Sequence, residues 1–182
     1  MDILNRTFTT YSVALAANCK PKNISDWCNV GNVIGQRKNV GTGNRRALSW
    51  FNLMEVAIAT EVLKITPSVQ FAFEAAQSFA HLGEGQTGSF DDAANDHEPR
   101  IPGLPWHHSR GHTLLAIWHD GSRVVLNQQF DPVTVTGGDN LADPPPAFVV
   151  VNVTRIFQAV CDRLALLPSE ILDEAYPETA KG

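Results

Sequence analysis

Two short helical segments followed by a basic, glycine-rich stretch constrain the fold of this chain more than any other feature. Residues 12–18 are rich in alanine at helical spacing, and Pro21 fits the first turn of a second helix. Ile24 and Trp27 are three residues apart and therefore share one face of that helix. Residues 35–46 are too polar to form a core. This order predicts a winged helix-turn-helix, in which the second helix enters a DNA groove and the wing contacts phosphates.

The charge of the chain is divided unevenly along its length. Residues 1–64 contain eight Lys and Arg against four Asp and Glu, whereas residues 65–182 contain six against fifteen. The net charge of −5 therefore hides a basic N-terminal part attached to an acidic remainder. Such an asymmetry between the two parts indicates that the basic one binds nucleic acid.

The central part of the sequence predicts a helical hairpin. Residues 50–64 follow Ser49, a residue type suited to an N-cap, and their apolar residues recur at helical spacing. Thr66 and Pro67 predict the cap and first turn of another helix over residues 68–82. This second helix is apolar on two faces, and because one face fills the core, we expect the other to meet a partner chain. The predicted oligomer interface consists of Phe71, Ala75, Phe79 and Leu82.

The remaining sequence predicts a loop followed by a small unit of hairpin, strand and helix. Residues 83–111 show no periodicity and are rich in Gly, Pro, Asp and His, which is typical of a flexible loop. The segments around Asp120 and Gly121 predict a β-hairpin. The other expected elements are a strand over 147–151, a helix that begins after Asn152 and is stopped by Pro168, and a short helix over 169–176.

These elements predict an α+β fold with two domains. Residues 1–65 form a winged helix-turn-helix DNA-binding domain, and residues 66–182 form an oligomerisation or interaction module with a flexible loop at 83–111. The sequence contains neither the pattern of a signal peptide nor an apolar run of membrane-spanning length. Three cysteines without CxxC spacing indicate free thiols in a reducing compartment. We therefore expect a cytoplasmic protein that is associated with the nucleoid when it is bound to DNA.

The N-terminal layout resembles the MerR-type winged-helix family over roughly residues 8–82. Tyr11 and Ser12 match the Tyr-Thr/Ser start that precedes the first helix of that family, and residues 23–28 align with its recognition helix, Thr-Ile-Arg-Tyr-Tyr-Glu. Residues 43–49 match the end of its wing, although the recognition-helix arginine falls at Ser25. The long dimerisation helix and the cysteine metal loop found in members of the family are absent. The resemblance therefore implies the mode of DNA binding. It does not imply that this chain shares the operator class or the effector of the family.

Eight residues are predicted to contact DNA. Lys20, Lys22 and Asn23 lie at the start of the second helix, where lysine can read guanine and asparagine can read adenine. Ser25 faces the same side and is expected to contact phosphate. The wing adds four cations. Holding four positive charges close together is unfavourable unless they bind an anion such as phosphate. These wing residues are Arg37, Lys38, Arg45 and Arg46.

The sequence favours a transcriptional regulator that binds duplex DNA as a homodimer, because pairing two winged helices doubles the contacted site. Two alternatives stay open: a DNA-architectural or recombination-directionality factor, and a metal-responsive regulator or metal-dependent enzyme that uses the histidine loop. In that loop, Ser109, Arg110 and Gly111 interrupt the spacing of His107, His108 and His112. We therefore assign no metal ligand, no cofactor and no catalytic residue, and we expect a protein without enzymatic activity. The sequence leaves a small-molecule effector undecided.

Overall fold

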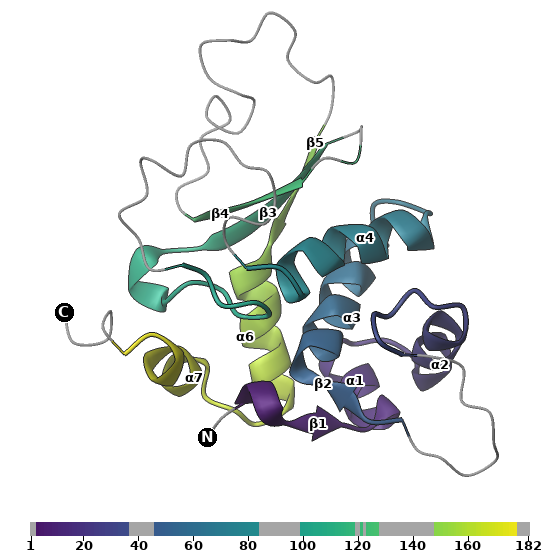
Figure 1. Ribbon diagram of the computed structural model, residues 1–182, viewed down its shortest axis with the longest axis horizontal. Coiled ribbons are helices and arrows are strands. Elements are labelled where there is room, and N and C mark those ends of the chain that lie inside the picture. Colours follow the sequence, from purple (N-terminus) through teal and green to yellow (C-terminus); the bar gives the residue numbers. More distant parts are fainter. Residues whose placement is uncertain are drawn as a thin grey trace, which may run out of the picture.

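The structure is a computed structural model, and it describes residues 3–36, 46–83, 99–118, 121, 123–127 and 148–177. Within these ranges the chain has six α-helices and two small antiparallel sheets, so the predicted α+β class is confirmed. Figure 1 shows the larger sheet standing above the helices. The elements are η1 (Ile3–Asn5), β1 (Thr7–Phe8), α1 (Thr10–Ala16), α2 (Pro21–Asn29), β2 (Leu48–Ser49), α3 (Trp50–Val62), α4 (Val69–Ala80), η3 (His108–Arg110), β3 (Thr113–Trp118), β4 (Arg123–Asn127), β5 (Phe148–Asn152), α6 (Val153–Arg163) and α7 (Pro168–Ala175).

The first two helices form where the sequence predicts them. Thr9 caps α1, because its Oγ1 accepts a hydrogen bond from the amide of Ser12 at 3.1 Å. Asn18 then turns the chain with a φ of +53°, a left-handed conformation that asparagine tolerates better than most residues. Pro21 occupies the first turn of α2, as expected, and α2 packs against α1.

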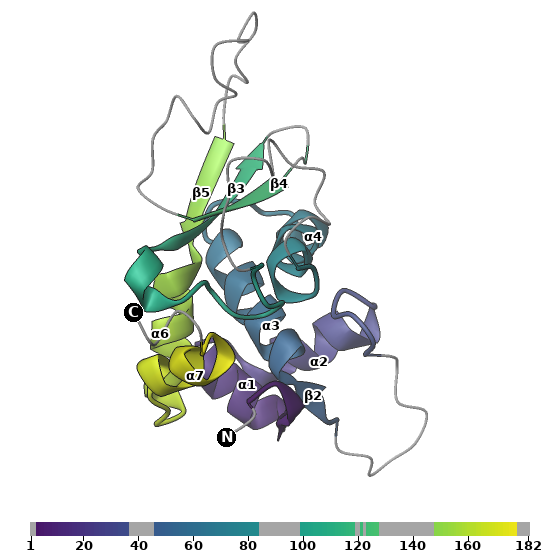
Figure 2. The same ribbon diagram turned by 60° about the vertical axis from the view of Figure 1, so that its left-hand side comes forward.

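Helix α3 forms the centre of the molecule (Figure 2). Ser49 caps it as predicted, through a reciprocal pair of hydrogen bonds between the side chains and backbone amides of Ser49 and Asn52. Ten of its thirteen residues are buried, because α1, α4, α6 and both strands of the smaller sheet pack around it. A helix that is surrounded on every side needs apolar residues all round, which explains its lack of a polar stripe.

The smaller sheet differs from the expected wing. Its two strands, β1 and β2, pair Thr7 with Ser49 and Phe8 with Leu48, so the strand that precedes α3 is held by the N-terminus of the chain. Val33, just before the predicted wing, lies in a bend and is buried in the core. Residues 37–45, which make up most of the predicted wing, lie outside the described residues, so the wing stays a prediction.

Helix α4 lies antiparallel to α3 in the predicted hairpin, but its start was placed wrongly. Ser68, rather than Thr66, is the N-cap, and its Oγ accepts a hydrogen bond from the amide of Phe71 at 3.2 Å. Ser68 can do this because its backbone is extended (φ −81°, ψ 107°), so its hydroxyl reaches the third amide of the helix, and Pro67 lies outside the helix. At the other end of α4, the buried side chain of Arg100 donates hydrogen bonds to the carbonyls of Phe79 and Leu82. It thus supplies donors to carbonyl groups that have no partner within the helix.

The larger sheet has the strand order β4-β3-β5, and α6 follows β5 directly. The predicted hairpin is confirmed, with Gly121 at a φ of +85° and its amide donating to the carbonyl of Trp118 at 3.0 Å. Asn152 caps α6, as expected, by accepting from the amide of Arg155 at 3.0 Å. The helix ends at Arg163, before Pro168, and Pro168 instead occupies the first turn of α7.

Residues 99–111 belong to the predicted flexible loop, yet they pack against the helices. Leu104, Trp106 and His107 are buried, and the indole N–H of Trp50 donates to the carbonyl of Gly103 at 3.0 Å. Gly103 has a φ of +73°, and a side chain there would meet the Phe51 ring at 3.0 Å. The prediction is wrong for this segment because it took the absence of periodicity for the absence of buried contacts. Residues 84–98 lie outside the described residues.

One hydrophobic core runs through the described chain. It includes Trp50 from the predicted DNA-binding range and Phe157 from the predicted interaction module, whose rings meet edge to face with centroids 6.0 Å apart. The division into domains at residues 1–65 and 66–182 stays a prediction. The contact between Trp50 and Phe157 crosses the predicted boundary. Among the helices of the described ranges, none combines the length and apolar character needed to cross a membrane.

Candidate nucleic-acid interface

Helix α2 is fixed to the protein by one face and presents the other to solvent. Ile24 and Cys28, four residues apart, are fully buried against the core. Trp27 is half-buried and meets the ring of Phe73 edge-on with centroids 5.2 Å apart, so it packs against α4. These three anchors orient α2 and leave its remaining side free.

The predicted contact residues of α2 lie on this free side. Lys20, Lys22 and Asn23 are all exposed, at or near the N-terminal end of the helix. Amide groups that lack helical partners also gather at this end, and together with the lysines they favour an anion. Asp26 is exposed further along the same helix and is its only acidic residue.

Ser25 differs from the other predicted contacts of α2. It is half-buried, and its Oγ donates to the carbonyl of Pro21 at 3.2 Å. Its hydroxyl proton is therefore engaged within the helix, a common arrangement for serine in a helix interior.

The described end of the predicted wing is tied to α2. Arg46 donates through Nη2 to the Oδ1 of Asn29 at 2.5 Å, which links the last residue of the basic stretch to the last residue of α2. The bond was not expected from the sequence, since the two residues are seventeen positions apart. Arg37, Lys38 and Arg45 lie outside the described residues.

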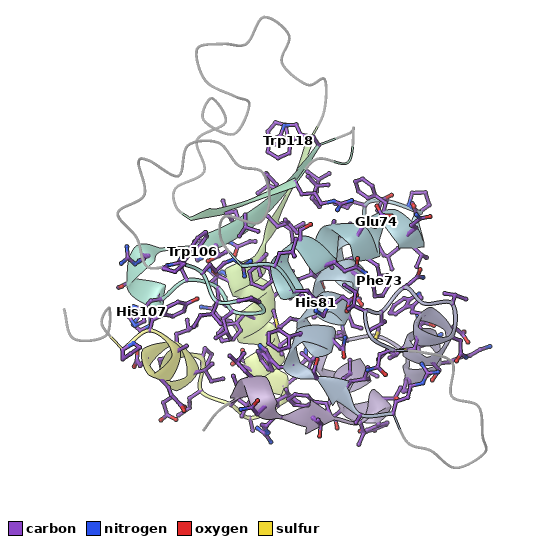
Figure 3. All side chains as sticks on the ribbon, viewed as in Figure 1. Phe73, Glu74, His81, Trp106, His107 and Trp118 are labelled. Atoms are coloured by element: carbon purple, nitrogen blue, oxygen red, sulfur yellow. The ribbon has the colours of Figure 1, made fainter. Side chains whose placement is uncertain are left out.

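A buried polar network fixes the other end of the same stretch. The fully buried carboxylate of Glu55 accepts hydrogen bonds from the backbone amide of Ile34 at 3.1 Å and from the side chain of Gln77 at 3.0 Å. It also lies 2.9 Å from Nε2 of His81 and 3.3 Å from Nδ2 of Asn52, which itself donates to the carbonyl of Ile34. We name these groups the Glu55 network. Figure 3 shows the labelled His81 near the end of α4, within the helical core.

The predicted oligomer interface is largely part of the chain's own core. Ala75 and Phe79 are fully buried, and the ring of Phe79 lies under the guanidinium of Arg100 at 4.4 Å. Phe71 and Leu82 are half-buried. Assigning Ala75 and Phe79 to a partner was therefore wrong, because the chain itself covers α4: Arg100 and Gly103 contact Phe79, and β4 also packs against the helix.

One exposed aromatic residue near α2 was missed as a site residue. Tyr11 of α1 is 72% exposed, and Leu15, one turn later, is 54% exposed. In helix-turn-helix proteins the first helix crosses the DNA backbone, where a tyrosine hydroxyl can bind phosphate. The sequence signal was available, since neither residue belongs to the apolar face formed by Val13 and Ala16.

The cysteines do not form a reactive site in the described structure. Burial, together with the neighbouring Asp162, raises the pKa of the Cys161 thiol from 9.0 to about 12. Burial also raises the pKa of Cys19, against the opposing effect of a hydrogen bond from Thr60. Both thiols therefore stay protonated near neutral pH, and a protonated thiol is a poor nucleophile.

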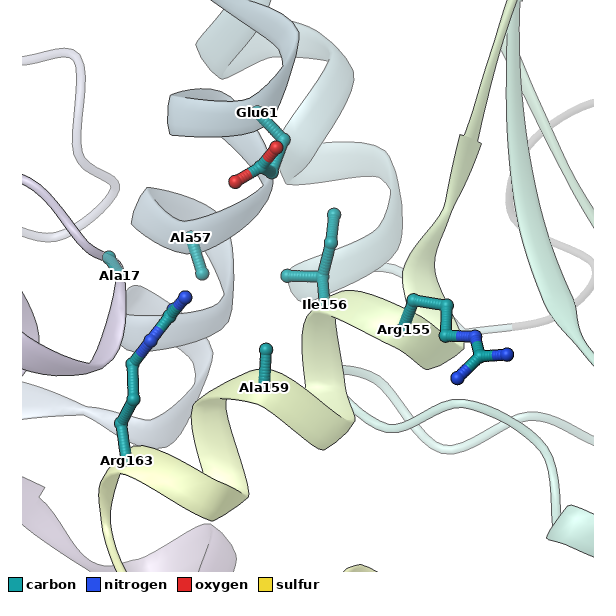
Figure 4. Close-up of a pocket in the computed structure, with 7 residues that line it drawn as sticks. All are labelled: Ala17, Ala57, Glu61, Arg155, Ile156, Ala159 and Arg163. Atoms are coloured by element: carbon teal, nitrogen blue, oxygen red, sulfur yellow. The ribbon is translucent and has the colours of Figure 1, made fainter.

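A small cleft between α1, α3 and α6 is the best candidate for an effector site that we found (Figure 4). Its volume is about 220 Å³, below the range of about 300–1,000 Å³ that encloses most small ligands. Arg163, at its edge, donates to the carbonyl of Ala16 at 2.7 Å and so caps α1. We assign no ligand to this cleft.

The histidine segment has a partner that the sequence did not suggest. His107 Nε2 lies 2.9 Å from Oδ1 of Asp173, which is supplied by α7. His112 is exposed and stands apart from this contact. Asp173 is 66 residues from His107 along the chain, so the residues next to the histidines in the sequence gave no sign of this contact.

Comparison with known proteins adds no family to these observations. The sequence matches no protein-family model and no curated protein.

Proposed function

We propose that this protein is a sequence-specific regulator that binds duplex DNA by placing α2 in the major groove. One observation carries the proposal: α2 is anchored through Ile24 and Cys28, while Lys20, Lys22 and Asn23 face solvent at its leading end. A recognition helix needs this combination, because its N-terminal residues reach base edges only if its other face is held rigidly.

The way in which both ends of the basic stretch are held supports a second contact with DNA, made by the wing. The Glu55 network holds the backbone at Ile34, and the bond from Arg46 to Asn29 holds the returning chain. The described residues on the two sides of this stretch are thus fixed, Ile34 to α3 and Arg46 to α2, and the proposal assigns a phosphate-contacting wing to the stretch between them. Tyr11 on α1 is available as a further phosphate contact.

The proposal is tested by titrating the protein against fragments of its own genome and then against the sequence selected from them. We expect an affinity that falls steeply with salt, by about 0.9 in the log–log slope for each phosphate contacted. Absence of binding to any fragment, or an affinity that is independent of salt, would refute the proposal.

Three variants locate the binding surface. Lys22→Ala and Asn23→Ala should each cost about 1–3 kcal/mol on the selected site and relax its preference at particular bases, because both residues are proposed to read base edges. Lys64→Ala removes the same charge as Lys22→Ala from the end of α3, where Lys64 pairs with Glu61 at 2.5 Å, and serves as the matched control. If Lys22→Ala and Lys64→Ala lose the same DNA affinity, the binding depends only on the net charge of the protein and not on the position of Lys22.

Homodimerisation belongs to the same proposal but requires a surface other than the buried side of α4. Light scattering of the free protein and of its DNA complex measures the stoichiometry. A symmetric selected site with two protein chains bound supports the regulator, whereas strong bending of DNA without sequence preference supports the architectural alternative.

A further inference from the structure

Three metal-ligating side chains converge where α7 packs against the segment before β3. His107 Nε2 lies 2.9 Å from Asp173 Oδ1, and His108 Nδ1 lies 3.7 Å from the same oxygen. One ligand atom from each of the three residues lies within 4.8 Å of the other two. Figure 3 shows His107 beside α7, on the opposite side of the molecule from α2.

These distances suit a small divalent ion. Nitrogen and oxygen ligands bind tetrahedral zinc at about 2.0–2.1 Å, which separates neighbouring ligand atoms by about 3.3 Å. The separations of 2.9 and 3.7 Å from Asp173 lie on either side of that value, and the two histidine nitrogens lie within 4.8 Å of each other, so small side-chain rotations bring all three ligands to an ion. Two imidazoles with one carboxylate favour a first-row transition ion over Mg²⁺ or Ca²⁺, which prefer oxygen ligands.

The first histidine is held in place by its second ring nitrogen. The side chain of His107 is only 4% exposed, and its Nδ1 lies 2.7 Å from Oγ of Ser109. The same Nδ1 accepts a hydrogen bond from the backbone amide of Ser109 at 3.3 Å, so Ser109 fixes the orientation of the ring through two contacts and directs Nε2 toward Asp173. His108 stacks on His107 with ring centroids 4.0 Å apart.

The two chain segments that supply the ligands are also held in place. On α7, Leu172 is buried beside Asp173, and the hydroxyl of Tyr176 accepts a hydrogen bond from the amide of Ile101 at 3.0 Å. On the other segment, the amide of Trp106 donates to Oγ1 of Thr113 at 2.9 Å. The ligand set is therefore largely formed before any ion binds, which lowers the cost of binding.

We propose that His107, His108 and Asp173 bind a divalent first-row transition ion, with zinc as the reference, and leave one coordination position open to solvent. His108 and Asp173 are about half-exposed, at 52% and 48%, so a water molecule or an external ligand can reach the fourth position. Three protein ligands with an open position are typical of reactive or regulatory zinc sites, whereas purely structural sites have four. The proposal is independent of DNA binding.

The test uses the full-length protein after removal of metal, titrated with Co²⁺ and then with Zn²⁺. We expect one equivalent of cobalt to give the strong visible absorption of a four- or five-coordinate ion, and zinc to abolish it. Zinc at a hundred times its dissociation constant should shift the unfolding equilibrium about 100-fold toward the folded state. Absence of stoichiometric binding, or a spectrum typical of six-coordinate aqueous cobalt, would overturn the site.

Variants of the exposed ligands separate a metal site from a simple contact between α7 and the histidines. His108→Ala and Asp173→Asn should each weaken cobalt binding by more than about 100-fold, and Ser109→Ala by about 10–100-fold. His112→Ala and Glu170→Gln, exposed neighbours outside the cluster, should leave it unchanged. If Asp173→Asn destabilises the fold while cobalt affinity is the same in every variant, the cluster is only a packing contact and the proposal fails.

Discussion

Replacing Glu55 tests whether the Glu55 network holds the chain between α2 and the predicted wing. Glu55→Ala removes the acceptor for four groups: the amide of Ile34 and the side chains of Asn52, Gln77 and His81. All four face a site from which water is excluded, since Glu55 has no exposed surface.

The expected loss of stability follows from these partners. A buried donor that loses its acceptor costs about 1–3 kcal/mol, but Asn52 and Gln77 keep second hydrogen bonds to the carbonyls of Ile34 and Asn32. The amide of Ile34 and the ring of His81 bear most of the loss. We therefore expect Glu55→Ala to lower the free energy of unfolding by about 2–6 kcal/mol, from two donors that each lose their acceptor at about 1–3 kcal/mol. Glu55→Gln keeps one acceptor oxygen and should lose less.

Urea denaturation followed by circular dichroism measures this loss, and hydrogen exchange at the amide of Ile34 locates it. Glu61→Ala is the matched control on the same helix, because it removes only a surface pair with Lys64 worth about 0.3–0.5 kcal/mol. If Glu55→Ala and Glu61→Ala lose the same stability, or if the Ile34 amide exchanges no faster in Glu55→Ala, the network does not anchor this segment.

Three further predictions concern other parts of the fold. Ala165→Gly should stabilise the protein by about 0.5–1 kcal/mol in thermal unfolding, because Ala165 ends α6 with a φ of +52°; a lower melting temperature would contradict the reasoning. Arg100→Met should cost about 2–4 kcal/mol in denaturant, since the last carbonyls of α4 lose a charged donor, and a neutral effect would show that water replaces it. Cys161 should resist thiol reagents in the folded protein at pH 8, and its contribution to stability should be complete below pH 9 and be lost as the pH rises toward 12, because only the unfolded chain ionises in that interval. Rapid labelling of Cys161 under native conditions would refute its burial.

Local signals in the sequence predicted most of the helices and the hairpin. Ser49 and Asn152 cap their helices as expected, because capping depends on one side chain and the backbone within the next three residues. Turn chemistry at Gly121 placed the hairpin for the same reason. Such interactions are complete within a few residues of sequence, so they can be predicted without knowledge of the fold.

The candidate interface was predictable in part. The exposed positions of Lys22 and Asn23 follow from the period of α2, since Ile24 and Cys28 define another face, whereas Lys20 is exposed because it is the cap residue before the helix. The tie between Arg46 and Asn29 was not predictable, because nothing in either residue's neighbourhood specifies the other. The amphipathic pattern of a helix indicates which side is buried, but not which distant segment meets it.

Only the tertiary structure decided what covers α4 and what faces the histidines. The second apolar face of α4 suggested a partner chain, but the chain itself covers the helix, with Arg100 against Phe79 and Leu104 in the core. Asp173 meets His107 because α7 folds back on the segment before β3, a consequence of packing Leu172 and Tyr176. Hydrophobic burial is not directional, so the sequence determined that these surfaces must be covered, and the packing of the whole chain decided by what.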